Sequence, residues 1–330
     1  MSISELEDEI RERINRRRKQ HELLTRSGDW HKLCSALDVV GDTELALDAY
    51  LGHPVVEHIG LRYLFVYGAL QLLQTQQDAV ADLCEALRIK SKISPKLPRV
   101  REIRSSAVAH PTEHRENKAS KSNFIQRISL SHHGFTLMTV YSDGRPYNLR
   151  AVSVPRLIKE QRGVLEAVLG EVLEKLDEEE MTHRKEHRDD KLSNVFPPVL
   201  GYYFQKIVEA AREPAYFPLG KMHVDLVSEC LARFKSLLEK RGEWGIYDSV
   251  NYEYELLEYP LAELRGFFTD QRASKLNERD AYIFSRFVQE ELRTLQQIAQ
   301  EIDEEYSRVP VRAKRANRAL KGPSRKRGAF

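Results

Sequence analysis

The stretch IGLRYLFVYGALQLLQTQQDAV, residues 59–80, carries the strongest helical signal in the chain. Its apolar residues recur at a helical period, at Ile59, Tyr63, Val66, Leu70, Leu73 and Val80. Apolar residues also cover the neighbouring faces, as expected for a helix in the interior of a bundle. Polar Gln76, Gln77 and Asp78 interrupt the pattern in its C-terminal half. We therefore predict one central helix within residues 55–88.

The segments before this stretch also read as helices. Residues 4–24 place Leu6, Ile10 and Ile14 on one face, with acidic residues first and basic residues later. That order complements the helix dipole. Residues 42–51 begin with good capping residues and predict a second helix, which His53-Pro54 ends.

Beyond residue 88, after one more short helix, the apolar pattern changes from a helical period to that of β-strands. A basic connector (90–98) leads into a helix expected over 99–109, which stops before Pro111. Three β-rich segments follow, FIQRISLS, FTLMTVYS and YNLRAVSV, separated by HHG (132–134) and DGRP (143–146). These connections predict two hairpin turns in a three-stranded meander over 124–154, with His132 and His133 exposed in the first turn.

Helices resume beyond Pro155. We predict them at 156–192, 199–213, 222–241, 252–268 and 277–306. The fold class is therefore mostly α, with one small antiparallel β-meander. The predicted domains are a helical bundle (1–120), the meander (121–155), a C-terminal helical region (156–307) and a basic disordered tail (308–330).

Charge is distributed unevenly along the chain. The whole chain has a formal net charge of +2, but residues 308–330 carry nine Lys or Arg and no acid, which leaves −7 for residues 1–307. Such a tail is typical of a disordered electrostatic arm. It suits binding to a phosphate backbone, and it equally suits a solubilising tail without a partner.

Cysteine usage and hydropathy indicate the compartment. The three cysteines lie far apart and form no CxxC pair, which favours a reducing compartment and gives no sign of structural zinc. The first twenty residues lack the apolar core of a signal peptide. The most apolar run, 63–77, is too short and too rich in glutamine to span a bilayer. We expect a soluble, cytoplasmic protein without a membrane partner.

The helix expected at 99–109 ends in an unusual sequence, REIRSSAVAHPTEH (101–114). Arg104 and His110 stand six residues apart, which in a regular helix separates them by about 240° around the axis. Because Pro111 turns the chain at once, the His110 ring can swing back over the last turn. Alternatively, the two residues act across a dimer axis, with each protomer supplying both.

This residue pair suits cleavage of RNA without a metal. Histidine exchanges a proton near neutral pH, and so it can activate the 2′-hydroxyl or protonate the leaving 5′-oxygen. Arginine presents a planar fork of donors to the charge that develops on phosphorus. The alternative is a purely structural role, in which the basic pair offsets the negative end of the helix dipole.

Arg104, the spacer SSAVA and His110 at a helix end before a proline resemble the Arg-x(4–6)-His signature of HEPN domains. Residues 68–80 are similar to the penultimate core helix of that family. The resemblance covers about the first third of the chain. It implies a dimerising bundle of four or five helices and metal-independent endoribonuclease activity, in a bacterial toxin–antitoxin or antiviral defence setting, with an antitoxin or defence protein as a possible partner.

The resemblance also assigns roles to single residues. Arg104 and His110 would be the catalytic pair, and no metal or other cofactor would be needed. Ser105 stands where the family commonly has Asn, Asp or His to orient the arginine. Around this pair we expect His114 and Glu113 as supporting residues. The basic residues expected to contact RNA are Arg101, Arg115, Lys118 and Lys121. As an alternative, 110–123 is a polar surface loop.

Two other readings stay open. His183 and His187, one helical turn apart, have the spacing of metal ligands, but the alternating charges around them favour a solvated helix face. The alternative to an RNase is a non-catalytic helical interaction or scaffold protein. Its helices at 156–306 would then dock a partner, and its basic tail would tether nucleic acid.

Overall fold

The computed structural model describes residues 1–109, 114–116, 119–270 and 274–307, with the backbone alone described at 109, 114–116 and 119. It divides into two compact units, Met1–Glu179 and Glu180–Phe330. The sequence-based division placed a boundary at 156, but residues 165–176 pack in the core of the first unit. The predicted class, mostly α with a small antiparallel sheet, is confirmed.

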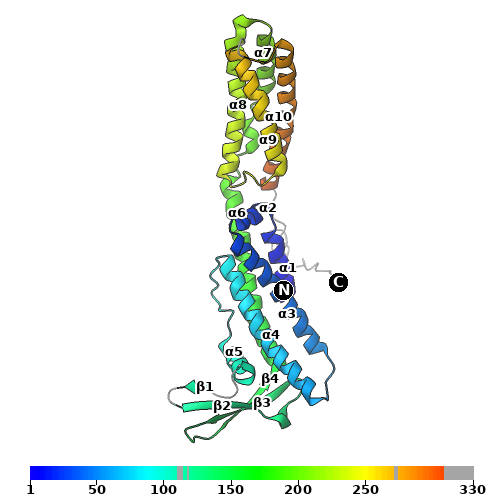
Figure 1. Ribbon diagram of the computed structural model, residues 1–330, viewed down its shortest axis with the longest axis vertical. Helices are drawn as coiled ribbons and strands as arrows, with labels where there is room; N and C mark the ends of the chain where they lie inside the picture. Colours follow the sequence, from blue (N-terminus) through cyan, green and yellow to red (C-terminus); the bar gives the residue numbers. More distant parts are fainter. Residues whose placement is uncertain (110–113, 117–118, 271–273, 308–330) are drawn as a thin grey trace, which may run out of the picture. The chain divides into compact units, whose positions relative to one another are not determined.

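The first unit contains long helices side by side and a small sheet at one end of them (Figure 1). Its helices are α1 (Ile3–Ile14), α2 (Arg17–Leu24), α3 (Ser27–Gly52), α4 (Ile59–Ala86), α5 (Pro98–Arg104) and the first part of α6 (Val154–His187). Residues 59–80 lie in α4, which packs along α3. Its central place in the bundle follows from its apolar faces.

The helix expected at 4–24 is in fact two helices. Ser2 and Glu5 form a capping box that starts α1, and α1 ends at Ile14 with Asn15 as its C-cap. Arg16 adopts an extended conformation, with ψ of 135°, and α2 starts after it. Asparagine is a poor residue for a helix interior because its side chain competes for backbone hydrogen bonds. The apolar period alone did not reveal this break.

The sheet has strand order β1-β2-β3-β4, with every neighbouring pair antiparallel. Its strands are β1 (His114–Glu116), β2 (Ala119–Ile125), β3 (Gly134–Tyr141) and β4 (Asn148–Ser153). The expected meander corresponds to β2–β4, and β1 adds a short fourth strand at the edge of β2.

The predicted first strand, FIQRISLS, was wrong beyond Ile125. Residues 127–129 form a 3-10 turn, in which the Ser129 hydroxyl accepts a 2.8 Å hydrogen bond from the Thr136 backbone N–H. The Ser129 hydroxyl therefore takes the place of the backbone carbonyl that a continuing strand would offer to the Thr136 N–H. Gly134 starts β3, and an added Cβ there would lie 2.1 Å from the Val152 carbonyl oxygen. The glycine therefore permits a close approach of two strands.

Two apolar clusters make up the interior of the first unit. One joins α1, α3, the C-terminal half of α4 and α6. The other joins the end of α3, the N-terminal half of α4, α5, the sheet and the start of α6. The three glutamines Gln76, Gln77 and Gln161 are all fully buried, and along α4 and α6 they fall between the two clusters.

These glutamines form a continuous chain of amide hydrogen bonds. Gln77 Nε2 donates to Gln161 Oε1 over 2.7 Å, and Gln161 Nε2 donates to Gln76 Oε1 over 2.8 Å and to the Leu73 carbonyl over 3.0 Å. Gln76 Nε2 in turn donates to Glu44 over 3.0 Å. The polar interruption in the apolar pattern of α4 is therefore a hydrogen-bonded layer across the bundle.

Replacing Gln161 with leucine is expected to lower the free energy of unfolding by about 2–4 kcal/mol, because each buried polar group left without a partner costs about 1–3 kcal/mol. Urea denaturation measures the change. Gln74→Leu, at a partly exposed position on α4, is the control and should stay within about 0.5 kcal/mol of wild type. Equal stability of the two variants would contradict the role of the network.

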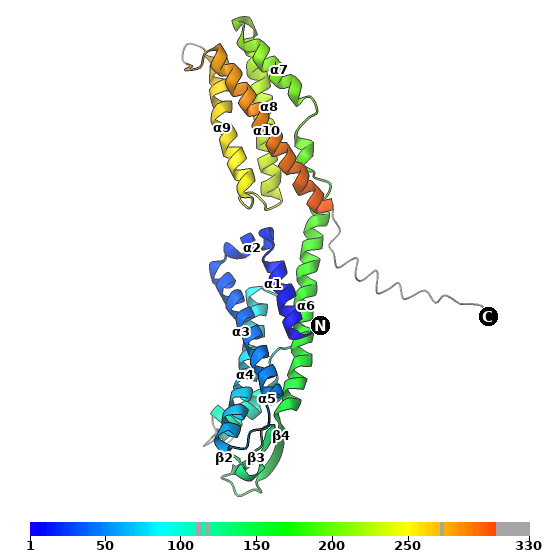
Figure 2. The same cartoon turned by 90° about the vertical axis from the view of Figure 1, so that its right-hand side faces the viewer.

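In its described residues the second unit folds as a bundle of four α-helices (Figure 2), preceded by the end of α6. They are α7 (Leu200–Ala211), α8 (Phe217–Lys240), α9 (Asp248–Thr269) and α10 (Glu278–Ser307). Contacts run from α7 to α8, α8 to α9, α9 to α10 and α10 back to α7, so that the four helices enclose one apolar core. The helices predicted here agree with these bounds to within a few residues.

Candidate active site

The segment that carries the expected catalytic arginine is a short helix followed by a wider turn. Pro98 occupies the first turn of α5, where its missing N–H costs nothing. The preceding Leu97 donates its backbone N–H to Gln77 Oε1 over 2.9 Å, which anchors the start of the helix to α4. Residues Ser105–Ala109 then form a π-helical turn. Such turns are rare and occur often at functional sites.

The π turn changes the geometry expected between Arg104 and His110. A separation of about 240° holds only for a regular α-helix. Because a π turn closes hydrogen bonds over one more residue, each residue in it rotates less around the axis. The angular separation calculated for a regular helix therefore does not apply across Ser105–Ala109. His110 itself, with Glu113 and Lys118, lies outside the described residues.

Arg104 is held by a neutral side chain. Its Nε and Nη2 both donate to the Oε1 of Gln71 on α4, over 3.0 and 2.7 Å. Gln71 also donates from Nε2 to the Thr75 hydroxyl over 3.2 Å. One amide oxygen therefore accepts two guanidinium N–H groups, and among the described residues the remaining donors of the half-buried Arg104 have no further acceptor.

The charge of Arg104 is balanced differently from that of its neighbours on α5. Arg99 pairs with Glu160 over 3.6 Å, and Arg101 pairs with Asp78 over 2.7 Å. Within the described part of the chain, Arg104 forms no ion pair with a carboxylate. Its positive charge is thus positioned without being neutralised, which suits the binding of an anion.

Ser105 occupies the place expected for the residue that orients the arginine. It ends α5, and its backbone N–H donates to the carbonyls of Arg101 and Glu102. The side chain that holds Arg104 is instead Gln71, from a different helix. Sequence reasoning did not single out Gln71. The sequence feature that could have indicated Gln71 is a polar residue within the apolar run 59–80, on the exposed side of the helix.

The expected RNA-binding residues are distributed over two elements. Arg101 is engaged with Asp78 on the helix side. On the sheet side, the backbone of β1 places His114 opposite Lys121 and Arg115 opposite Ser120. The β2 strand lies against the π turn. Lys121 and the backbone of β1 therefore lie in the sheet whose β2 strand contacts the turn after Arg104.

His183 and His187 belong to a polar cluster rather than to a fully solvated helix face. His183 Nε2 lies 2.9 Å from the Arg241 carbonyl oxygen, and its Nδ1 lies 3.3 Å from the Tyr306 hydroxyl. Both ring nitrogens of His183 are therefore engaged by protein groups. Burial, and then the positive charges of Arg241 and Lys240, lower the pKa of His187.

His132 was expected to be exposed in a hairpin turn, and this prediction was wrong. Its side chain is fully buried and stacks on Tyr50, with ring centroids 5.2 Å apart. The Tyr50 hydroxyl donates to the His132 carbonyl over 2.6 Å, and His132 Nε2 lies 3.3 Å from the Tyr50 carbonyl oxygen. The rings of His53, Phe65 and His133 complete the cluster. The loop folds inward because the His132 ring packs into this aromatic cluster.

This cluster predicts a pH-dependent stability. Burial, with smaller contributions from the charges of His133 and His53, lowers the pKa of His132 below its usual 6.5. The unfolded chain therefore binds this proton at a higher pH than the folded chain does. The free energy of unfolding should fall as the pH drops below about 6.5 and towards the folded-state pKa.

Urea denaturation at pH 7.5 and pH 5.5 measures this effect. Wild type should lose more stability between the two pH values than His132→Phe, which retains an aromatic ring but cannot be protonated. An equal loss in both proteins would show that His132 does not carry the pH dependence.

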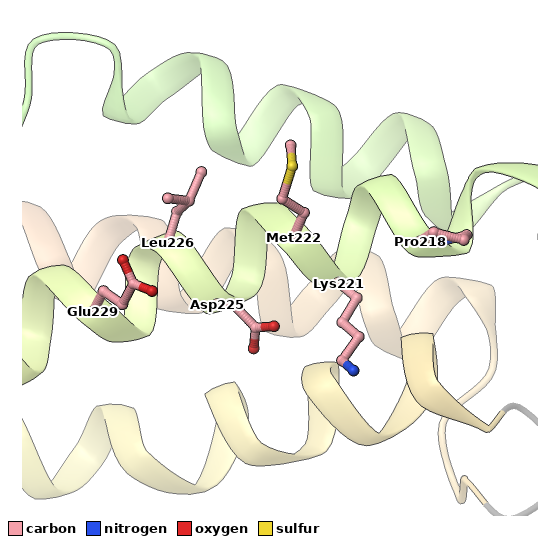
Figure 3. Close-up of a pocket in the computed structure, with 6 residues that line it drawn as sticks. All are labelled: Pro218, Lys221, Met222, Asp225, Leu226 and Glu229. Carbon is pink, nitrogen blue, oxygen red and sulfur yellow. The ribbon is translucent and has the colours of Figure 1, made fainter.

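The second unit has a shallow depression of about 270 Å³ along α8 (Figure 3). Its lining residues are Pro218, Lys221, Met222, Asp225, Leu226 and Glu229. They come from one helix face, and Asp225 is already paired with Arg265 over 2.7 Å. The depression contains none of the residues that the sequence analysis singled out.

Comparisons with known proteins match the chain to no family model, no curated protein and no solved structure. Across the residues that the structure describes, no helix combines the length and the apolar character that crossing a membrane requires.

Proposed function

We propose that this chain is a metal-independent endoribonuclease that uses Arg104 and His110 as its catalytic pair. The observation that carries the proposal is Arg104 itself. Its guanidinium is fixed by the neutral Gln71, while Arg99 and Arg101 on the same helix are paired with carboxylates. A positioned cation that has no carboxylate partner among the described residues, and that stands six residues before a histidine, is suited to a phosphodiester.

The reaction requires only proton transfer and charge stabilisation. The 2′-oxygen of one ribose attacks the adjacent phosphorus, and the bond from phosphorus to the 5′-oxygen breaks. His110 takes the proton from the 2′-hydroxyl or gives one to the leaving 5′-oxygen, and water carries out the other of these two transfers. Arg104 holds the negative charge that grows on the phosphate oxygens. The products are a 2′,3′-cyclic phosphate and a 5′-hydroxyl.

The resemblance to HEPN domains supports this proposal and extends it. It implies a homodimer in which both motifs meet in one cleft, and a setting in bacterial toxin–antitoxin or antiviral defence systems with a protein partner that restrains the activity. A cytoplasmic location accords with an RNA substrate. These extensions rest on the resemblance alone.

A second candidate is a non-catalytic interaction protein. Five tyrosines of the second unit, each about half exposed or more, favour it: Tyr202, Tyr216, Tyr252, Tyr259 and Tyr282. Tyrosine is enriched at protein interfaces because it offers a large apolar ring and a polar tip. In this alternative the C-terminal helices dock a partner, and the basic residues of 308–330 tether nucleic acid.

RNA cleavage in the presence of EDTA tests the proposal. Purified full-length protein, checked for dimerisation, is incubated with single-stranded and structured RNAs, and the product ends are identified. The proposal expects cleavage that persists in EDTA and leaves 2′,3′-cyclic phosphates. If no RNA of either kind is cut by the dimeric protein, the interaction protein becomes the better account.

A further inference from the structure

The hairpin between β3 and β4 carries an ordered cation–aromatic stack. The guanidinium of Arg145 lies over the Tyr141 ring, with its carbon 4.1 Å from the ring centroid. In the register of the sheet, Tyr141 stands directly opposite Lys121, and Lys121 stands opposite His114. An aromatic ring and a lysine are therefore neighbours across two strands.

Asp143 fixes the stack in place. Its carboxylate accepts hydrogen bonds from the Arg145 backbone N–H over 3.3 Å and from Arg145 Nε over 2.9 and 3.0 Å. These hydrogen bonds, with that of the Arg145 side chain first, lower the pKa of the Asp143 carboxyl. Gly144 turns the chain with φ of +79°, a conformation that side chains disfavour. The turn thus holds Arg145 over the ring before any ligand arrives.

The stack lies on the side of the sheet that faces α5. Alternate residues of a strand point to the same face, so Tyr141 shares its face with Leu137 and Phe135. Both of these are buried in one cluster with Ile103 of α5. A 3.2 Å ion pair between Glu102 and Arg150 also ties α5 to β4. Tyr141, which is partly exposed, therefore lies at the open end of the sheet face that packs against the helix carrying Arg104.

The local charge favours nucleic acid. Residues 114–153 contain six Lys or Arg and two acidic residues, although residues 1–307 as a whole have an excess of acids. Single-stranded RNA is recognised by stacking of unpaired bases on aromatic rings and on arginine planes, and by lysine contacts to phosphates. In a duplex, the faces of the bases are already stacked on each other.

We propose that the Tyr141–Arg145 stack binds an unpaired base of single-stranded RNA, with Lys121 at a neighbouring phosphate, and so selects single-stranded over duplex substrates. This inference rests on the proposed endoribonuclease function and adds its substrate class. Tyr141 is a substrate-positioning residue in this account, distinct from the Arg104–His110 pair.

The test compares Tyr141→Leu with Tyr141→Phe in the full-length protein. The probes are a fluorescent 12-nucleotide RNA with 2′-O-methyl riboses, which lacks the attacking hydroxyl, and the corresponding duplex. Tyr141→Leu should raise the Kd for the single strand, and the KM for a cleavable single strand, about 5- to 100-fold. The kcat should change less than about twofold. Tyr141→Phe keeps the ring and should match wild type, and duplex affinity should be unaffected in both variants.

The outcomes separate this inference from the proposed function. If wild type cleaves RNA and Tyr141→Leu has an unchanged Kd and KM, the stacking site is wrong and the nuclease stands. If wild type binds the single strand but cuts no RNA, and Tyr141→Leu loses the binding, the stacking site stands and the nuclease fails. If wild type neither binds nor cleaves single-stranded RNA, both are overturned.

Discussion

Replacing Arg104 with alanine is expected to slow RNA cleavage by about 10²–10³-fold, the usual loss when one donor to a transition-state oxyanion is removed. The free energy of unfolding should change by only about 0.5–1.5 kcal/mol, because the substitution removes hydrogen bonds to a single exposed side chain, that of Gln71. Single-turnover cleavage at saturating RNA separates the catalytic effect from any weakening of RNA binding.

Two further variants make this prediction specific. Arg99→Ala removes the same charge from the same helix, but Arg99 is already paired with Glu160, so its cleavage rate should stay within about threefold of wild type if general attraction of RNA changes little. Arg104→Lys keeps a charge without the planar fork, and its activity should lie between those of alanine and arginine. Equal losses in Arg99→Ala and Arg104→Ala would assign Arg104 a general electrostatic role only.

The largest expected loss of stability belongs to the second unit, at Asp303. Its carboxylate accepts hydrogen bonds from the backbone N–H groups of Leu192 and Ser193, each over 2.9 Å, and from the Ser193 hydroxyl over 2.8 Å. It also pairs over 3.2 Å with Arg241, whose side chain is only 1% exposed. Asp303→Ala leaves a buried guanidinium without this charge partner, which should cost about 3–5 kcal/mol.

Urea denaturation followed by circular dichroism measures this change. A chain with two units need not unfold in one step, so the transition that contains the second unit is the one to compare. Asp225→Ala is the matched control, because Asp225 also pairs with an arginine of the same unit, but the pair is partly exposed. Its loss should stay below about 1 kcal/mol. Similar losses in the two variants would contradict the importance of burial.

The sequence predicted most of the helices because long apolar periods are local information. The helix within 55–88 and the helices of the second unit follow directly from such periods. The break at Asn15 and Arg16 and the fully buried Gln76–Gln77–Gln161 layer do not. Each depends on hydrogen bonds that are invisible in the spacing of apolar residues, and in the amide layer these join helices far apart in sequence.

The candidate site was only partly predictable for the same reason. The sequence located Arg104 at the end of a helix. It did not indicate that Gln71, thirty-three residues earlier, accepts both N–H groups of that arginine. It also treated Ser105–Ala109 as regular helix, where the structure has a π turn. His132 was assigned to the surface because the aromatic ring that stacks on it, Tyr50, is distant in sequence.

RNA cleavage by His110→Ala in EDTA tests the central claim most directly. His31→Ala is the control, since it removes an exposed histidine of α3 and leaves the proposed pair and the residues expected around it intact. We predict that wild type and His31→Ala cut single-stranded RNA in EDTA, while His110→Ala is slower by about 10²–10⁴-fold. Cleavage by His110→Ala at the wild-type rate would contradict the assignment of the catalytic pair.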